Sequence, residues 1–429
     1  MALPVASPVR AGIVVTGTEV LTGRVTDRNG PWLAEALRGL GVDVGRIVVV
    51  GDRPEDLASA LRFQLADHDL VLTTGGLGPT ADDLTTAVVA EVQGRALRLD
   101  PDLEARIAAI VAGLHAQRGW APPGAAAAAG IRKQAMVPDD AAVLEPVGTA
   151  PGLVVPGPGA PVVVLPGPPS ELRPMWTDAV AVPAVRAVLA RAVELRQSEV
   201  RIWGPPEAEL AAALRDHEDT HGPLADAGLE VTTCVRDGEL EIVTRYAPDA
   251  AAAYAGLLDF LHTRFGAQVF SDDGRRLDDV VAELLLARAA TIATAESCTA
   301  GLLAGRLADR PGSSAYLLGG FVTYANEAKT AEVGVPAELI ERLGAVSREV
   351  AQGMAAGARA RLGTTVGVGI TGVAGPGGGT ADKPVGLVHV AVDVEGRVHH
   401  RELRLGGTRE LIRRRTVVAA LHLVRQALQ

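Results

Sequence analysis

Residues 12–50 read GIVVTGTEVLTGRVTDRNGPWLAEALRGLGVDVGRIVVV and contain one complete strand–helix–strand pattern. Two apolar runs, one at each end, enclose an amphipathic stretch at 31–40. This stretch begins with Pro31 and is followed by Gly41, and that placement of proline and glycine is typical of a helix. Asn29 stands where a residue that caps the helix is expected. The segment therefore predicts a strand, a helix and a second strand.

The same alternation continues along the chain. Further helices are expected at 54–66 and 84–92, and further strands at 70–72 and 162–165. Strands that alternate with helices predict a parallel sheet covered by helices on both faces. The alternation returns after Leu277 and ends in a predicted hairpin and a last helix.

The stretch between these two α/β regions has a different pattern. Its expected strands follow one another closely in the sequence and do not alternate strictly with helices. The sequence therefore predicts an α/β protein in which two three-layer α/β/α domains are joined by a small α+β domain. The expected domains are 1–173, 174–268 and 269–429. This division agrees with the prior of roughly 150 residues per domain.

Composition and charge exclude several classes of protein. The chain has 429 residues, a net charge of −10 and only 3% aromatic residues, so a nucleic-acid partner is not expected. Two cysteines are too few for a disulfide framework or a cysteine-rich zinc site. No apolar run reaches the roughly 18 uninterrupted residues of a membrane span, and the first ten residues do not resemble a signal peptide. We expect a cytoplasmic protein without a membrane partner.

The motif AESCTAG (Ala295–Gly301) follows an expected strand and opens an expected helix. A serine at a helix N-terminus can act as a nucleophile if a base lies near, because the free N–H groups stabilise a developing anion. The alternative is that Ser297 or Thr299 only caps the helix. Cys298 is a rival nucleophile, although small buried cysteines are the commoner case.

A second motif, VTYANEAK (322–329), supplies candidate bases for a serine that has no histidine partner. Tyr324 and Lys329 can each accept a proton only if burial or a neighbouring charge favours it. The alternative is a packed tyrosine and a solvated lysine.

Two further features point to an anionic group on the substrate. The glycine loop ITGVAGPGGG (370–379) leaves backbone N–H groups free at the end of a strand, where they can hold a phosphate or an oxyanion. Arg409 and Arg413 share one face of the last helix, and arginine is the usual partner of a phosphate monoester. A flexible turn and a solvated basic face are the alternatives.

These motifs, together with GAVS (344–347) and KPVG (383–386), resemble the CinA C-terminal family in order and spacing. That family contains nicotinamide mononucleotide deamidases, which need no cofactor. The resemblance implies that Ser297 is the nucleophile and that Tyr324 and Lys329 activate it. It implies substrate contacts at Glu296, Thr299, Gly301, Thr371, Gly372, Gly375, Arg409 and Arg413. Ala300 departs from the second glycine of many members, and we expect little effect from it.

The first part of the chain is similar to the molybdopterin-binding-like domain of full-length CinA proteins, through VTGTEVLTGRVTDRN (15–29), TTGGLGPTADDLT (73–85), RKQAMVP (132–138), VGTAPG (147–152) and VVVLPGPPSEL (162–172). In that family the domain is associated with metal-dependent hydrolysis of ADP-ribose. We expect a nucleotide site at Gly75, Gly76, Gly78 and Thr80. The paired carboxylates Asp82 and Asp83 suit Mg²⁺ or Mn²⁺, and helix capping is their alternative role.

The leading hypothesis is hydrolysis of the carboxamide of nicotinamide mononucleotide by a serine nucleophile, in pyridine-nucleotide salvage. The alternatives are a metal-dependent ADP-ribose pyrophosphatase in the N-terminal domain, alone or as a second activity, and a non-catalytic nucleotide-binding scaffold. The middle domain resembles the KH-like insert of the same proteins, but it has no GxxG loop, so RNA binding is not expected. The resemblance also implies a homodimer.

Overall fold

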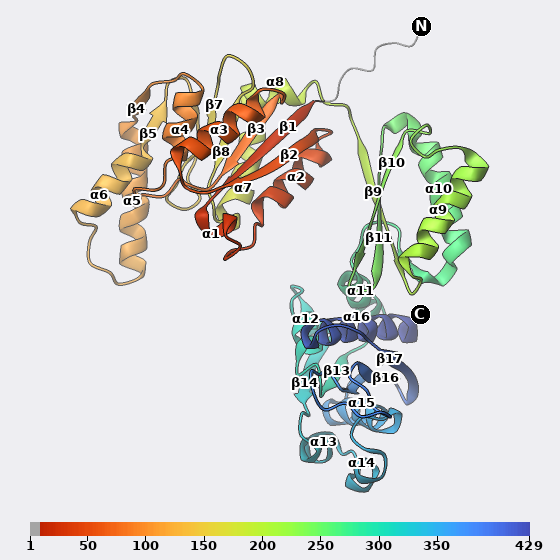
Figure 1. The fold of residues 1–429 in the computed structure, drawn as a ribbon. Helices are drawn as coiled ribbons and strands as arrows, with labels where there is room; N and C mark the ends of the chain where they lie inside the picture. The colour runs from red at the N-terminus through yellow and green to blue at the C-terminus, as the bar shows by residue number, and fades with distance from the viewer. Residues whose placement is uncertain (1–8) are drawn as a thin grey trace. The chain divides into compact units, whose positions relative to one another are not determined.

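The computed structural model describes residues 9–429. Residues 1–8, on which the predicted absence of a signal peptide depends, lie outside the described residues. The chain divides into two compact units, the first ending at Arg196 and the second comprising residues 197–429 (Figure 1). Across residues 9–429, no helix is both long enough and apolar enough to cross a membrane.

The first unit contains a six-stranded sheet with the order β2-β1-β3-β8-β7-β6. Strands β2, β1, β3 and β8 are parallel, and β7 and β6 are antiparallel to their neighbours. Strands β1, β3 and β8 are almost continuous buried apolar runs, as expected where helices cover both faces. The strands are β1 (Arg10–Thr16), β2 (Asp43–Val50), β3 (Leu70–Thr74), β6 (Ala142–Leu144), β7 (Gly152–Val155) and β8 (Val162–Leu165).

Helices pack on both faces of this sheet. One face is covered by α2 (Asn29–Gly39), α7 (Pro169–Ala181) and α8 (Pro183–Leu189), and the other by α3 (Pro54–Leu65) and α4 (Thr85–Val92). Strand β1 shows how the two cores arise, because Ile13 and Val15 belong to the first core and Val14 to the second. Successive strand side chains point to opposite faces. The predicted three-layer α/β/α arrangement is therefore confirmed for this unit.

A smaller core lies beside the main sheet. Leu103 and Ile107 pack against Ile131 and Ala135, and β4 pairs with β5 in an antiparallel ladder. The remaining elements of the unit are α1 (Thr18–Leu21), β4 (Leu97–Leu99), α5 (Pro101–Gln117), α6 (Ala125–Gln134) and β5 (Met136–Pro138).

The predicted cap of α2 is wrong. Asn29 is the first residue of the helix, and its side-chain amide donates to Thr74 Oγ1 at 2.8 Å and to the Gly167 carbonyl at 2.6 Å. Asp27 instead accepts the backbone N–H groups of Asn29 and Gly30, at 2.9 and 3.0 Å. The preference of asparagine for caps was overridden by tertiary contacts that the sequence alone does not show.

The stretch 179–196 is rich in alanine, valine and arginine and predicts one helix, but the structure divides it. The helix is interrupted at Val182, because Pro183 begins α8, and the last residue of the stretch begins strand β9 (Arg196–Trp203). Both α7 and α8 pack into the core of the first sheet. The first unit therefore extends beyond the expected boundary at 173.

The second unit contains two separate sheets, and the larger one has the order β14-β13-β15-β16-β17. Strands β14, β13 and β15 are parallel, whereas β16 and β17 complete the sheet as an antiparallel hairpin. Glu395 and Gly396 form the hairpin turn with φ values of 51° and 92°, which confirms the predicted turn. The strands are β13 (Ile292–Glu296), β14 (Leu317–Val322), β15 (Val366–Gly372), β16 (Leu387–Val394) and β17 (Arg397–Arg404).

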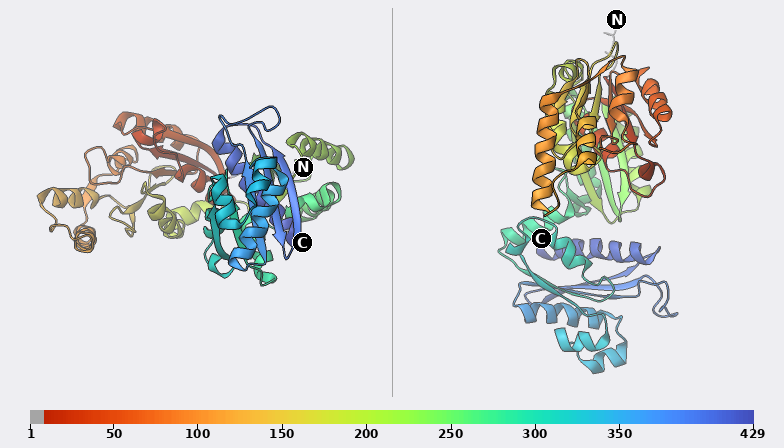
Figure 2. Two further views of the ribbon diagram at one scale, coloured as in Figure 1. Left: turned by 90° about the horizontal axis from the view of Figure 1, so that it is seen from below. Right: turned by 90° about the vertical axis from the view of Figure 1, so that its left-hand side faces the viewer.

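This sheet also has helices on both faces (Figure 2). α11 (Leu277–Ala287), α12 (Leu302–Ala308) and α16 (Arg409–Leu428) cover one face. α13 (Asn326–Val333), α14 (Ala337–Leu343) and α15 (Arg348–Leu362) cover the other. Gly367 and Gly369 of β15 let α15 approach closely, since a Cβ atom at either position would lie 2.1 Å from a backbone oxygen of α15. These glycines serve packing, so they do not form a nucleotide-binding turn.

The smaller sheet has the order β10-β11-β9-β12 and packs against two helices. We call residues 197–271 the middle subdomain and residues 277–429 the C-terminal subdomain. The predicted small α+β fold of the middle subdomain is confirmed. Its further elements are β10 (Leu229–Arg236), β11 (Glu239–Tyr246), β12 (Val269–Ser271), α9 (Glu207–His221) and α10 (Ala251–Phe265).

Candidate functional site

Ser297 lies at the carboxyl end of the C-terminal sheet, directly after β13. Its backbone N–H donates to the Ile370 carbonyl of β15 at 2.9 Å, which fixes the residue between two parallel strands. The side chain is largely buried. Clefts at the carboxyl ends of parallel strands are the usual ligand sites of α/β sheets, so the serine stands at a suitable place for chemistry.

The expected helix N-terminus is not available to Ser297. Helix α12 begins at Leu302, with Gly301 as its N-cap. The N–H groups of Gly301, Leu303 and Ala304 donate to the Glu296 carboxylate at 3.1, 3.0 and 2.8 Å. The prediction that Ser297 opens the helix is therefore wrong.

The same contacts change the role of Glu296. The side chain is fully buried, and Thr294 adds a hydrogen bond of 3.2 Å to the carboxylate. A carboxylate that satisfies a helix N-terminus in this way is a structural cap. The structure therefore gives Glu296 a role in shaping the loop, and its substrate contact stays a prediction.

The backbone that follows Ser297 is held by Arg413 of α16. The guanidinium donates from Nε to the Cys298 carbonyl at 3.0 Å and from Nη2 to the Thr299 carbonyl at 2.9 Å. Cys298 is buried in the apolar core, and burial raises the pKa of its thiol to about 12. A thiol of this kind is neutral at physiological pH and is a poor nucleophile.

Lys329 is almost completely buried near this loop. Its Nζ donates to the carbonyls of Thr323, Tyr324 and Ala325, at 2.9, 3.2 and 3.4 Å. Burial lowers the pKa of Lys329, and the neighbouring Cys298 opposes that effect. The lysine therefore holds the segment that carries Tyr324.

Arg409 connects Tyr324 to the glycine loop. Its Nη2 donates to the Tyr324 hydroxyl at 2.8 Å, and its Nη1 donates to the Gly375 carbonyl at 2.7 Å. Tyr324 itself is about half exposed. Two arginines one turn apart on α16 thus contact all three of the predicted motifs.

The other predicted loop residues have structural contacts of their own. The hydroxyl of Thr371 donates to the Ala345 carbonyl at 2.8 Å, and Gly372 ends β15 against Val388. Thr299 is fully buried, and its Oγ1 has no hydrogen-bond partner in the structure. Within residues 9–429, no hydrogen bond joins the Ser297 hydroxyl to Tyr324 or to Lys329.

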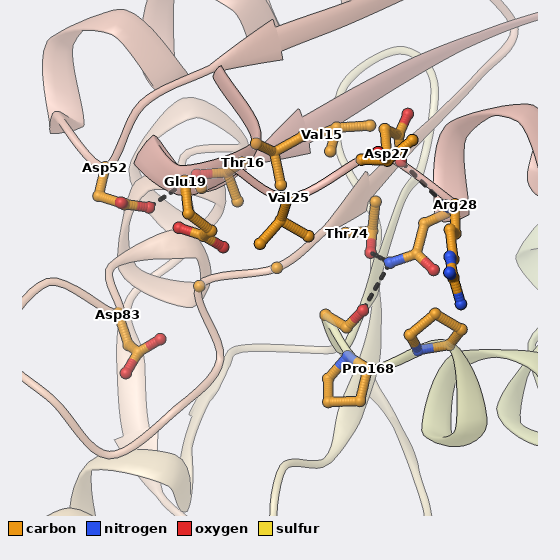
Figure 3. A pocket seen from close by; sticks show the side chains of 18 of the residues that line it. Val15, Thr16, Glu19, Val25, Asp27, Arg28, Asp52, Thr74, Asp83 and Pro168 are labelled. Atoms are coloured by element: carbon orange, nitrogen blue, oxygen red, sulfur yellow. Dashed lines mark hydrogen bonds between the residues drawn. The ribbon is translucent and has the colours of Figure 1, made fainter. Parts of the chain in front are cut away.

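The first unit contains a cavity of about 600 Å³ at the carboxyl ends of β1, β3 and β8 (Figure 3). The predicted residues Gly75, Gly76, Asp82 and Asp83 line this cavity. Gly78 lines a smaller neighbouring cavity of about 100 Å³. Two of the four predicted nucleotide-site residues and both predicted metal ligands therefore line one cavity.

Thr80 contacts both of the paired carboxylates. Its hydroxyl lies 2.5 Å from Asp82 and from Asp83, and its N–H donates to Asp83 at 2.9 Å. The hydrogen bond from Thr80 lowers the pKa of Asp82. No group of three or more acidic, histidine or cysteine side chains suited to a metal occurs within residues 9–429. A cation on this pair would therefore need further ligands from water and phosphate.

Several cavity residues were not predicted as site residues. They lie at the last residue of a strand, in the segment that follows it or at the start of the next helix, around the carboxyl ends of β1, β2, β3 and β8, and are Thr16, Glu19, Asp27, Arg28, Asn29, Asp52, Thr74 and Gly167. The rule that ligands bind at the carboxyl ends of parallel strands would have indicated them. Their signal in the sequence is polar residues placed immediately after each apolar run.

Comparison with known proteins gives matches along nearly the whole chain. The family described as CinA C-terminal domain matches residues 274–428, and the family described as probable molybdopterin binding domain matches residues 12–187. A CinA-like protein from Mycolicibacterium gilvum is 57% identical over 98% of this chain and 98% of its own length. Another from Mycobacterium tuberculosis is 52% identical over 98% of this chain and 97% of its own length.

Solved structures are similar to part of the chain. The competence/damage inducible protein CihA from Agrobacterium tumefaciens is 44% identical, with a TM-score of 0.34. The similarity covers 35% of this chain and 94% of that one.

Proposed function

Because this chain belongs to the CinA family, we propose that its C-terminal subdomain hydrolyses the carboxamide of nicotinamide mononucleotide. The products are nicotinate mononucleotide and ammonia, so the reaction belongs to pyridine-nucleotide salvage. The observation that carries the proposal is the pair of α16 arginines, which joins the serine loop, Tyr324 and the glycine loop.

The reaction proceeds in two steps. Ser297 Oγ attacks the carboxamide carbon, and its proton passes through Tyr324 or Lys329 to the leaving nitrogen, which departs as ammonia. Water then attacks the ester, releases the carboxylate product and returns the proton to the serine. Free N–H groups of the glycine loop are the candidate donors to the tetrahedral oxyanion, because Glu296 already occupies the N-terminus of α12.

An ammonia-release assay on nicotinamide mononucleotide tests the proposal. Ser297→Ala should lower kcat by at least about 10³-fold, because the covalent step is lost. The matched control is Cys298→Ala, which should keep the rate within about threefold because that thiol is buried and neutral. Chelation of metals by EDTA should leave the reaction unchanged.

Two outcomes would contradict this assignment. An active serine variant with an inactive cysteine variant would make the protein a thiol amidase. Unchanged rates in both variants would place deamidation at another site or remove it from this protein.

A second activity, metal-dependent hydrolysis of the pyrophosphate bond of ADP-ribose, is favoured by the large cavity of the first unit. Asp82 and Asp83 would hold Mg²⁺ or Mn²⁺ against the pyrophosphate, and the cation would neutralise its charge. Asp83→Asn should abolish AMP release from ADP-ribose and leave ammonia release intact. Full AMP release by this variant would remove the metal assignment.

A further inference from the structure

The cavity of the first unit contains a buried hydrogen-bond acceptor without a donor. Asn29 is 8% exposed and lines the cavity, and its Oδ1 has no hydrogen-bond partner. A buried polar atom of this kind costs about 1–3 kcal/mol unless something supplies a donor. The cavity at its side is large enough for a nucleotide-sized ligand to be that donor.

The hydrogen-bond network fixes the orientation of the Asn29 amide. Its Nδ2 donates to Thr74 Oγ1 and to the Gly167 carbonyl. The Thr74 hydroxyl proton is already donated to the Pro166 carbonyl at 2.9 Å, so Oγ1 can only accept from Asn29. A flipped amide would bring its oxygen against two acceptors, and the free atom is therefore Oδ1.

Asp27 supplies a second acceptor in the lining of the same cavity. Asp27 Oδ1 accepts the N–H groups of Asn29 and Gly30, and no hydrogen bond reaches Oδ2 from the described residues. Asp27 lines the same cavity and is partly exposed. Two acceptors two residues apart at the start of α2 suit a ligand that carries two neighbouring donors.

The two sides of the cavity carry different side chains. Glu19 and Asp52 lie together, with Asp83 nearby, and Asp27, Arg28 and Thr74 are on the other side (Figure 3). A phosphate has no proton to donate at neutral pH, so Asn29 Oδ1 and Asp27 Oδ2 would repel it. The donors of an adenine nucleotide are its sugar hydroxyls and the amino group of its base, and the vicinal hydroxyls of a ribose match two acceptors on separate side chains.

We propose that Asp27 and Asn29 form a subsite for the vicinal hydroxyl groups of a ribose, one carboxylate oxygen and one amide oxygen each accepting a hydroxyl proton. The inference rests on the second proposed activity, because it takes the ligand to be a ribose-containing nucleotide. It makes Asp27 and Asn29 specificity-determining residues, and it assigns them no chemical step.

The subsite is tested by combining a change in the protein with a change in the ligand and measuring the binding affinity of each combination. ADP-ribose is titrated calorimetrically in Mg²⁺ against its analogues that lack the 2′-hydroxyl on the adenosine ribose or on the terminal ribose. In the unmodified protein, one of the analogues should bind at least about 10-fold more weakly, because it leaves a buried acceptor unpaired. In Asp27→Asn or in Asn29→Ala, whichever removes the acceptor of the missing hydroxyl, this preference should fall below about threefold.

The variants and controls keep the outcome clear. Asp27→Asn keeps the oxygen that accepts from α2, so it should fold even if Asn29→Ala is destabilised. Glu19→Gln, on the other side of the cavity, should keep the full preference for the hydroxylated ligand. An undiminished preference in Asp27→Asn and Asn29→Ala would overturn the subsite. Absence of ADP-ribose binding to the unmodified protein would overturn the second activity and the subsite with it.

Discussion

Ala300 has a left-handed backbone, with φ of 50°, between Thr299 and the helix cap Gly301. A side chain costs free energy in this conformation, and glycine relieves it. We predict that Ala300→Gly raises the free energy of unfolding by about 0.5–1 kcal/mol. Thermal or urea denaturation measures the change. The matched control is Ala304→Gly within α12, which should lower stability by about 1 kcal/mol.

The sequence predicts little effect of Ala300, and its left-handed backbone is a reason to expect a measurable one. Its small size suggests little effect, and the size of the side chain is indeed not the issue. The backbone conformation is what matters, and it becomes visible only once the loop is folded around Glu296. A destabilised Ala300→Gly variant would show that this loop tolerates the alanine without strain.

The buried ammonium group of Lys329 makes the free energy of unfolding depend on pH. Its folded pKa lies below the ordinary lysine value because the ammonium is buried. The unfolded chain therefore binds more protons than the folded one below about pH 10.5, and stability should rise with pH through that window. We predict that Lys329→Met loses this rise and loses about 1–3 kcal/mol at pH 10, since the Thr323 and Tyr324 carbonyls lose their donor.

Urea denaturation at pH 8 and pH 10 measures this effect. Lys383→Met is the control, because Lys383 also donates to a carbonyl, that of Leu343, but is only partly buried. The control should keep the rise in stability between the two pH values. Loss of the rise in the control alone would refute the assignment to Lys329.

Helix α16 shows how an element can hold several motifs at once. Arg409 reaches Tyr324 and Gly375 with two different nitrogens, and a lysine has a single nitrogen that cannot keep both geometries. We predict that Arg409→Lys lowers kcat/KM for nicotinamide mononucleotide by about 10- to 100-fold, mainly through KM. Steady-state ammonia release measures it.

A second arginine on the same helix provides the control. Arg414 pairs with Asp237 of the middle subdomain at 2.7 Å and has no contact with Tyr324 or Gly375. Arg414→Lys should keep kcat/KM within about threefold of the unmodified protein. Equal losses in both variants would mean that Arg409 acts only through the stability of α16.

Long, strongly patterned elements could be predicted from the sequence. The bounds expected for β8 agree with the structure, and so do the predicted hairpin and last helix of the chain, because apolar runs or clear caps mark their ends. The sequence pattern predicts no helix or strand between residues 93 and 161. Helix α5 buries only Leu103 and Ile107, and α6 is rich in alanine, so neither shows an apolar stripe.

The candidate sites could be predicted from the sequence only in part. Motif order indicated which loops of the C-terminal subdomain meet, and the arginines of α16 bring them together. The contacts of Glu296 and Lys329 with backbone atoms could not be foreseen, because they depend on where a neighbouring helix or loop lies. The rule for parallel strands would have indicated the region of Asp27 and Asn29, but the unpartnered oxygen of Asn29 depends on Thr74 and on the distant Gly167.

At the scale of the whole second unit, buried charges connect the middle subdomain to α16. Glu239 of β11 contacts His422 of α16 at 2.8 Å, and Trp203 of β9 stacks on the same histidine at 4.1 Å. Burial raises the pKa of Glu239 to about 7, although Arg306 and Arg201 oppose it, and Asp278 and Glu241 add to it. Burial lowers the pKa of His422 well below its usual value, so Glu239 is the group that changes charge near neutrality.

This connection predicts the direction in which pH changes stability. Between about pH 4.5 and pH 7 the folded unit binds more protons than the unfolded chain, because the folded pKa of Glu239 is the higher one. The stabilisation is fully present below the unfolded pKa and is lost as the pH rises through about 7. A difference of this size corresponds to about 3 kcal/mol at most. Glu239→Gln keeps the shape without the charge and should flatten this part of the profile.

Trp203 provides the measurement. It is the single tryptophan of the second unit, so replacing Trp32, Trp120 and Trp176 by phenylalanine leaves a local fluorescent probe next to His422. In the protein that keeps only Trp203, urea unfolding should give a lower free energy of unfolding at pH 8 than at pH 5. This difference should be smaller when Glu239→Gln is added. Glu241→Gln removes the smallest of the charges that raise the pKa of Glu239, so it should keep most of the loss of stability between the two pH values. A pH profile unchanged by Glu239→Gln would mean that this carboxyl group does not titrate at the interface with α16.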